Sequence, residues 1–83
     1  MIEPTIPVMS ENEAKATLAE LGARVRAWRA RRCMTRKALA ADSGLSERFL
    51  ADVESGRGNV SINSLEAAAR ALNISILDLL QDA

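Results

Sequence analysis

Apolar residues recur at intervals of three and four along much of the chain, which is the period of an α-helix that buries one face. The pattern is clearest in the segment after Ser10 and again after Ser61. It predicts a succession of helices without strands. The apolar positions are Ala14, Leu18, Leu21, Val25 and Trp28 in the first segment, and Ile62, Leu65, Ala69 and Leu72 in the second.

Hydroxyl side chains in front of the apolar segments indicate where helices begin. A Ser or Thr there accepts a hydrogen bond from backbone N–H groups that have no partner within the helix. Two of these hydroxyls are followed three residues later by an acid, Glu13 and Asp78, which is typical of a capping box. Five helices are therefore predicted, after the candidate caps Ser10, Thr35, Ser46, Ser61 and Ser75.

Residues that tolerate a positive φ indicate where helices end. Gly44, Gly56 and Asn73 adopt this conformation at low cost, so each fits just beyond a helix. The run Ser43-Gly44-Leu45-Ser46 then makes a tight corner between two short helices. The predicted helices run from 11 to about 32, from 36 to 43, from 47 to about 55, from 62 to 72, and onward from 76.

Two prolines set the first residues apart from the helices. Pro4 and Pro7 disfavour a helix over residues 1–9, because proline lacks a backbone N–H and restricts the residue before it. We expect a flexible N-terminal arm over residues 1–9 and one domain over residues 10–83. Of the 83 residues, 48% are hydrophobic, mainly Ala and Leu, with one Trp, one Phe and no Tyr. This composition suits one small all-α domain with a modest core.

Composition also removes several kinds of site. The chain has no His, and Cys33 is its single cysteine, which excludes disulfide frameworks, the usual zinc sites and imidazole-based triads. It has no Gly-rich phosphate loop followed by Lys. We therefore expect no enzyme, no metal site and no cofactor. No apolar run reaches the roughly 18 residues of a membrane span, and no targeting segment is present, so a cytoplasmic protein is expected.

Charge is balanced over the whole chain but not along it. Eleven basic and eleven acidic residues give a net charge of zero, which alone disfavours a polyanionic partner. Residues 22–37 nevertheless hold seven bases and no acid, so any phosphate contacts are expected to start there. A solvated helix face is the alternative interpretation. The seven bases are Arg24, Arg26, Arg29, Arg31, Arg32, Arg36 and Lys37.

About a dozen residues agree in register with a known domain: Val25, Trp28-Arg29, Thr35, Leu39-Ala40, Gly44-Leu45-Ser46, Leu50, Val53-Glu54 and Gly56. With them, residues 21–80 resemble the helix-turn-helix domain of the Xre/Cro-type phage-repressor family. The resemblance implies a compact five-helix, lambda-repressor-like fold with its helix-turn-helix at residues 35–55. It also implies a sequence-specific DNA-binding transcriptional regulator, most simply a repressor, whose partner is double-stranded operator DNA.

Three segments show a narrower similarity, namely residues 34–37, 43–51 and 58–62. They resemble the DNA-binding half of benzoyl-CoA-responsive regulators of aromatic catabolism, whose second half resembles shikimate kinase. This similarity implies either the DNA-binding part of a longer regulator, with a small-molecule effector that acts through a domain absent from this chain, or a stand-alone relative.

The resemblance assigns base reading to the third helix. In this family the recognition helix enters the major groove with its N-terminal residues toward the base edges. Carried over, the base-facing residues are Glu47, Arg48 and Asp52, with Ser46 and Phe49 beside them. An arginine donates two bonds to guanine, and a carboxylate accepts from cytosine, so a G·C-containing half-site is the working hypothesis. Alternatively, Arg48 and Asp52 pair with each other, and Glu47 only favours the helix dipole.

Phosphate contacts are expected at two places around that helix. The second helix begins with Arg36 and Lys37, where free backbone N–H groups attract anions, and Arg36 replaces a frequent Gln of the family. The loop after the third helix resembles the family's second phosphate clamp. Ser43 is also a candidate, although its hydroxyl alternatively caps its own helix. The phosphate candidates are Arg36, Lys37, Ser43, Arg57, Gly58 and Asn59.

Other members of the basic segment are given structural roles. Arg29 and Glu54 match a pair that forms an internal salt bridge in the family. Trp28 lies on the apolar stripe and is expected in the core rather than under a base. Cys33 stands where the family commonly has Gly, so mild backbone strain is expected if its φ is positive. The remaining arginines, Arg24, Arg26, Arg31 and Arg32, are expected to face solvent, with one or two reaching phosphates.

Two functional classes remain in view. The leading interpretation is a regulator that binds as a homodimer to half-sites about one helical turn apart. The dimer contact is assigned to the last helix (Ile76, Leu77 and Leu80) or to the arm (Ile2, Ile6 and Val8), although folding into the monomer's own core is the simpler role for most of them. The alternative is a protein-interaction adaptor or antitoxin-like module on the same fold.

Overall fold

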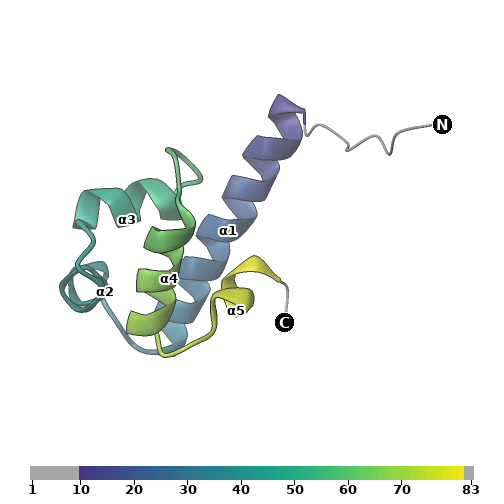
Figure 1. The fold of residues 1–83 in the computed structure, drawn as a ribbon. Coiled ribbons are helices and arrows are strands. Elements are labelled where there is room, and N and C mark those ends of the chain that lie inside the picture. The colour runs from purple at the N-terminus through teal and green to yellow at the C-terminus, as the bar shows by residue number, and fades with distance from the viewer. Residues whose placement is uncertain (1–9, 82–83) are drawn as a thin grey trace.

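The structure is a computed structural model that describes residues 10–81. This part of the chain forms five helices. They are α1 (Glu11–Arg31), α2 (Arg36–Ser43), α3 (Glu47–Glu54), α4 (Ile62–Ala71) and α5 (Ile76–Leu80) (Figure 1). No strand occurs within residues 10–81, so the predicted all-α, five-helix fold is confirmed. The predicted arm, residues 1–9, lies outside the described residues.

Each helix begins at the hydroxyl that the sequence indicates. The side chains of Ser10, Thr35, Ser46 and Ser61 each accept a hydrogen bond from the backbone N–H three residues later, at 3.0–3.1 Å. Ser75 forms the predicted capping box with Asp78, whose carboxylate accepts from the Ser75 N–H at 2.9 Å. Three helices end one residue before the predicted position, because the last residue serves as the C-cap.

Four helix ends use a left-handed residue. Gly44 follows α2 with φ 77°, Gly56 follows α3 with φ 76° and Asn73 follows α4 with φ 58°, as predicted. Cys33 follows α1 with φ 54°, the positive value that a glycine would adopt more easily. The strain expected at this cysteine is therefore located at the turn between α1 and α2.

The core lies between the five helices. The most deeply buried side chains are Val25 of α1, Leu39 of α2, Leu50 of α3, Leu72 after α4 and Leu79 of α5. Along α1 one side packs on α3 and another on α5, while α4 packs on α2 and α5. Burying large aliphatic side chains from every helix is the main favourable term in folding a domain this small.

Trp28 fills the corner between α1 and α5, as predicted for a core residue. Its ring packs against the buried cluster. The indole Nε1 donates to the backbone oxygen of Asp78 at 3.4 Å, and the guanidinium of Arg31 lies 4.7 Å from the ring centroid. Both contacts hold the indole ring against the domain itself, as expected for a core residue rather than one that stacks on a base.

The apolar stripes are less completely buried than the periodicity predicts. Ile62 is 63% exposed, so its assignment to a buried face is wrong. It is the first residue of α4, and the buried residues of that helix begin one turn later with Leu65. Ala14 and Leu18 are only half-buried, because the first turns of α1 extend beyond the other helices (Figure 1).

Gly22 lets α1 pass against the end of α3, a feature that the sequence analysis did not identify. The glycine is buried, and a Cβ on it would lie 2.9 Å from the backbone oxygen of Glu54 and closer still to that of Val53. A larger residue would push the two helices apart. The contact therefore fixes where α3 ends relative to α1.

The described residues form neither a membrane-spanning helix nor a metal-ligating cluster. Within 10–81, no helix is long and apolar enough to cross a bilayer. The same described part contains no group of three metal-ligating side chains that could hold an ion.

Candidate nucleic-acid interface

A tight corner places α2 and α3 relative to each other. Gly44 turns the chain with its positive φ, and Ser46 then caps α3. The Ser43 hydroxyl accepts from the Leu45 N–H at 3.2 Å and lies 3.4 Å from the Ala40 oxygen. Ser43 is half-buried, so its hydroxyl is engaged within the corner, which is the capping role considered for it.

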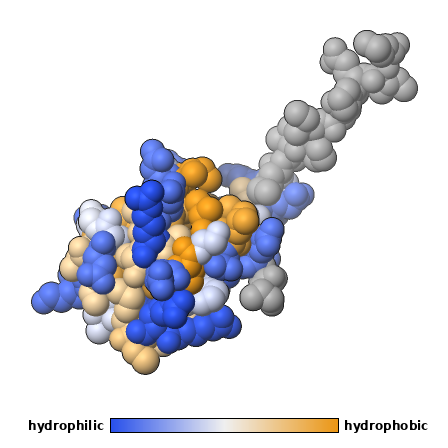
Figure 2. Space-filling model, turned by 60° about the horizontal axis from the view of Figure 1, so that its bottom comes forward, coloured by the Kyte–Doolittle hydropathy of each residue, from blue (hydrophilic) through white to orange (hydrophobic). Residues whose placement is uncertain are grey.

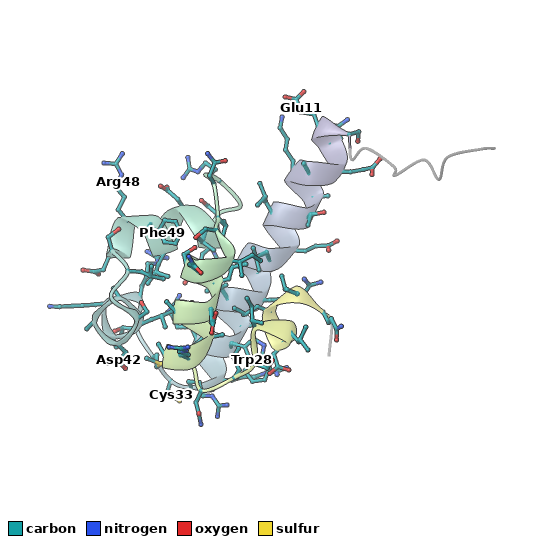
Figure 3. The ribbon with its side chains drawn as sticks, in the orientation of Figure 1. Glu11, Trp28, Cys33, Asp42, Arg48 and Phe49 are labelled. Carbon is teal, nitrogen blue, oxygen red and sulfur yellow. The ribbon has the colours of Figure 1, made fainter. Side chains whose placement is uncertain are left out.

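α3 has one face in the core and one in solvent. Leu50, Val53 and Glu54 are buried, while Glu47 and Arg48 are exposed. Arg48 points away from the body of the domain (Figure 3). Because the buried face is held by the core, the exposed face has a fixed orientation.

The other base-reading candidates lie beside Arg48 in different surroundings. Ser46 is exposed but uses its hydroxyl to cap α3, and Phe49 is half-buried against the core. Asp52 is also half-buried, and its backbone oxygen accepts from the Arg57 N–H at 2.8 Å. Within the described residues Arg48 and Asp52 form no ion pair, so the alternative in which they only neutralise each other is not observed.

The loop between α3 and α4 exposes a second group of candidates. Arg57, Gly58 and Asn59 are all exposed. The Arg57 side chain folds back, donating from Nε to the Ser55 hydroxyl at 3.1 Å, and Gly58 has φ 84°. The backbone N–H groups and the guanidinium therefore lie together on one surface loop, as an anion clamp requires.

The two bases at the start of α2, Arg36 and Lys37, lie in different surroundings. Lys37 is exposed. Arg36 is turned toward the domain instead, with Nη2 3.5 Å from Oε1 of Glu54 and its side chain 41% exposed. The buried carboxylate of Glu54 attracts this guanidinium. The phosphate contact predicted for Arg36 did not include this internal partner.

Glu54 is the centre of an ion-pair cluster. Its side chain is 0% exposed, and it accepts two bonds from Arg29, from Nε and Nη2, each 2.9 Å long. Arg29 also donates to the Met34 backbone oxygen at 3.0 Å. The predicted internal pair is therefore present as a bidentate bridge between α1 and the end of α3. Arg26 adds a third cation, with Nε 3.7 Å from Oε1 of Glu54.

This cluster perturbs the ionisation of both main partners. Burial alone raises the pKa of Glu54, but hydrogen bonds and charge from Arg29, together with Arg36, outweigh it and hold the pKa below its ordinary value. The same hydrogen bonds raise the pKa of Arg29, against a smaller opposing effect of burial. Both groups are therefore charged at neutral pH.

Two arginines expected to face solvent instead connect helices. The side chain of Arg24 is only 19% exposed, lies 3.6 Å from Glu20 and donates to a backbone oxygen of α5 at 3.3 Å. Arg32 is exposed, but its Nε donates to the Leu72 oxygen at 2.9 Å. The solvent-facing prediction is wrong for Arg24 and incomplete for Arg32, because partners 40 or more positions away cannot be inferred from local spacing.

Residues 20–81 match the family described as "Helix-turn-helix domain". The chain is also similar to the immunity repressor protein of Bacillus phage phi105, with 43% identity over 56 residues, which are 68% of this chain and 39% of the phage protein. This chain thus spans about two fifths of the length of that curated relative.

Solved structures of similar fold include the restriction-modification controller protein C.AhdI from Aeromonas hydrophila, with 34% identity and a TM-score of 0.75 over 77% of this chain and 97% of that one. The clp gene regulator ClgR from Corynebacterium glutamicum is 36% identical, with a TM-score of 0.73 over 77% and 68% of the two chains. The matched region contains α2, α3 and the loop that follows them. The chain belongs to the helix-turn-helix domain family, a family of DNA-binding transcription regulators.

Proposed function

We propose that this chain is the sequence-specific DNA-binding domain of a transcriptional repressor, and that α3 reads base edges in the major groove. The observation that carries the proposal is Arg48, which is exposed on α3 and points away from a helix whose other face is buried. A guanidinium presented in this way is suited to donate two hydrogen bonds to a guanine. Glu47, on the same exposed turn, is the second candidate reader.

Phosphate contacts around α3 come from two neighbouring elements. Lys37 lies in the first turn of α2, where the helix dipole also favours an anion, and Arg57 lies in the loop after α3 with Gly58 and Asn59. Such contacts set the orientation of a domain on the duplex, while base contacts set the sequence. Ser43 is the weakest candidate, since the corner already uses its hydroxyl.

Substitution of Arg48 tests the reading helix. An operator is first obtained by footprinting the neighbouring promoter, and its affinity is measured by fluorescence anisotropy at fixed salt. Arg48→Ala is expected to weaken operator binding by about 1–3 kcal/mol, or roughly 5- to 150-fold, and to relax discrimination at one base pair.

Arg70→Ala is the matched control, because Arg70 is also exposed but lies on α4 and pairs with Glu66 at 3.1 Å. It removes the same charge and is expected to leave discrimination unchanged. Equal effects of the two substitutions on affinity and discrimination would show that Arg48 contributes only bulk charge.

We further infer that the domain acts as a homodimer on two half-sites about one helical turn apart. The eight residues of α3 offer little reading surface, and pairing two domains doubles it. Leu77 and Leu80 support α5 as the contact, since they are 56% and 44% exposed. Figure 2 shows hydrophobic residues gathered on one face of the molecule, with hydrophilic residues around them.

The narrower role in aromatic catabolism is a separate proposal. It rests on the similarity of residues 34–37, 43–51 and 58–62 to benzoyl-CoA-responsive regulators, and it places the effector in a part of the regulator other than these 83 residues. Isothermal titration of the full-length regulator with benzoyl-CoA tests it. Release of operator DNA on binding is expected, and an unchanged operator affinity contradicts it.

One observation favours a second candidate function, a protein-binding adaptor. Two acids of the reading helix that are not fully buried, Glu47 and Asp52, lie near the proposed DNA surface, and carboxylates are repelled by DNA phosphates. Titration with random duplex DNA at two salt concentrations separates the functions. A DNA-binding domain is expected to bind more tightly at low salt, whereas absence of binding even at low salt supports the adaptor.

A further inference from the structure

Three guanidinium groups gather around one buried carboxylate at the junction of α1, α2 and α3. Arg29 occupies both oxygens of Glu54 with two 2.9 Å bonds. Arg26 and Arg36 reach the same oxygen, Oε1, at 3.7 and 3.5 Å. Since Arg29 already forms the short bonds, the contacts of Arg26 and Arg36 are long and use only one nitrogen each. Glu54 thus leaves donors of both side chains unused, although one of them, Nε of Arg36, is buried.

The cluster has a surplus of positive charge. Three cations share one anion, and no other acid among residues 10–81 lies within ion-pair distance of Arg26 or Arg36. The remaining ion pairs in this part of the chain, Arg24–Glu20 and Arg70–Glu66, are formed elsewhere. Two like charges beside the same oxygen repel each other, and an anion placed between them would relieve that repulsion.

The side chains of the two outer arginines are partly open to solvent. The side chains of Arg26 and Arg36 are 62% and 41% exposed, whereas that of Arg29 is 19% exposed. Within the described residues Nε of Arg36 is buried without a hydrogen-bond partner, so its guanidinium is held in place by Glu54 alone. Both groups lie within 3.7 Å of one oxygen atom, Oε1 of Glu54, so the two guanidiniums are neighbours.

We propose that Arg26 and Arg36 jointly bind a single backbone phosphate of duplex DNA. The proposal rests on the DNA-binding function proposed above and adds a contact on α1 to it. Guanidiniums form short, charge-assisted hydrogen bonds with phosphate oxygens, and a tetrahedral phosphate offers oxygens to both neighbours at once. The N-terminus of α2, where Arg36 is the first residue, adds favourable partial charge at the same place.

Prior attachment to Glu54 makes this site more effective than two free side chains. A long side chain that is ordered only on binding loses conformational freedom, which weakens the contact. Arg26 and Arg36 come from different helices, yet the shared carboxylate already restricts both. The pair is therefore preorganised in the DNA-free domain.

The salt dependence of DNA binding counts the phosphates involved. For duplex DNA the slope of log K against log salt falls by about 0.9 for each phosphate that a protein no longer neutralises. We compare the unmodified chain with Arg26→Gln, Arg36→Gln, the double variant and Arg70→Gln, using one duplex over a series of salt concentrations. Circular dichroism verifies that each variant is folded, which is expected because Arg29 still pairs with Glu54.

A shared phosphate predicts that the double variant loses the equivalent of one phosphate contact rather than two. Each single variant should lose part of one phosphate equivalent, and the double variant should lose about 0.9 in slope in total. Arg70→Gln is expected to change the slope much less. A slope for Arg26→Gln equal to that of Arg70→Gln overturns the proposal, as does a loss of about 1.8 in the double variant, which indicates two separate phosphates.

Failure of the underlying function looks different from failure of this site. If the unmodified chain does not bind duplex DNA at low salt, the DNA-binding proposal itself is wrong. If the unmodified chain binds and the Arg26 variants match the control, only the shared phosphate site is wrong.

Discussion

The carboxylate of Glu54 connects three helices, because its cationic partners lie on α1 and α2 while Glu54 itself ends α3. A buried ion pair contributes little net stability compared with apolar residues of the same shape, since removing two charges from water is costly. Removing one partner is a different matter, because the other charge then stays buried without compensation. Glu54 is therefore important for holding the helices in one arrangement.

Acid titration of Glu54 should be visible in the stability of the domain. Its folded-state pKa is lowered, so it stabilises the fold at pH values above the unfolded value of about 4.3. That contribution is lost as the pH falls through the lower folded-state pKa. We predict that Glu54→Gln lowers the free energy of unfolding at pH 7 by about 3 kcal/mol or more, and flattens its decline in acid.

Urea unfolding at a series of pH values measures both effects. Glu66→Gln is the control, since Glu66 is exposed and its pair with Arg70 is at the surface. That substitution should change stability by less than about 1 kcal/mol and preserve the acid-induced decline. Parallel pH profiles for the Glu54 variant and the unmodified chain would contradict the assigned role of Glu54.

At the scale of elements, the crossing of α1 and α3 depends on the missing side chain of Gly22. Alanine normally stabilises a helix interior by up to about 1 kcal/mol relative to glycine. Here the added Cβ would lie 2.9 Å from the Glu54 oxygen, a backbone atom that cannot rotate away. Overpacking of this kind costs about 1–3 kcal/mol, so the packing cost exceeds the gain in helix propensity.

We therefore predict that Gly22→Ala destabilises the domain, by a net of about 1–2 kcal/mol. The free energy of urea unfolding measures it, with an unchanged dependence on urea as the sign that the folded state is retained. Ala23→Gly is the companion variant, because Ala23 is the exposed neighbour and should lose only helix propensity. Stabilisation by Gly22→Ala would mean that α1 and α3 do not cross here.

The boundaries of the elements were predictable because caps act locally. A hydroxyl at Ser46 or Thr35 satisfies N–H groups within the next turn, so the sequence contains all the partners. The same holds for the left-handed residues Gly44 and Asn73, whose conformational preference needs no distant contact. The first four helices consequently end within a residue of their predicted positions, and α5 begins after its predicted cap, Ser75.

Contacts between elements were less accessible to sequence reasoning. Periodicity gives the apolar side of α4 but not how far along the helix packing extends, so Ile62 was misassigned. A run of arginines shows charge but not its partners, and Arg26 and Arg36 reach Glu54 across 28 and 18 positions of sequence. The Arg29–Glu54 pair was anticipated only because a family resemblance supplied the long-range information.

For the whole molecule, the structure shows where the bases of a chain of zero net charge lie. Much of the positive segment is engaged internally, at Glu54, at Trp28 and at the end of α4. The exposed Lys37, Arg48 and Arg57 lie on or beside α2 and α3. Bulk attraction to DNA is therefore weak, and affinity must come from a few oriented contacts and from pairing of domains.

The exposed leucines of α5 provide the test of pairing. Leu77 and Leu80 are three positions apart, so they lie on the same side of the helix, while Leu79 is buried beneath them. In a symmetric dimer each residue is buried twice, once in each subunit. We predict that the Leu77→Ser, Leu80→Ser double variant raises the dimer dissociation constant at least tenfold, as measured by sedimentation equilibrium.

Ile62→Ser is the appropriate control, because Ile62 is 63% exposed on α4 and this substitution also replaces an exposed apolar side chain with a polar one. If α5 forms the dimer contact, the control variant sediments like the unmodified chain, and the leucine variant sediments as a monomer. The leucine variant should also bind a single half-site as tightly as the unmodified monomer but lose the advantage of a paired site. Dissociation caused by Ile62→Ser instead would move the contact from α5 to the start of α4.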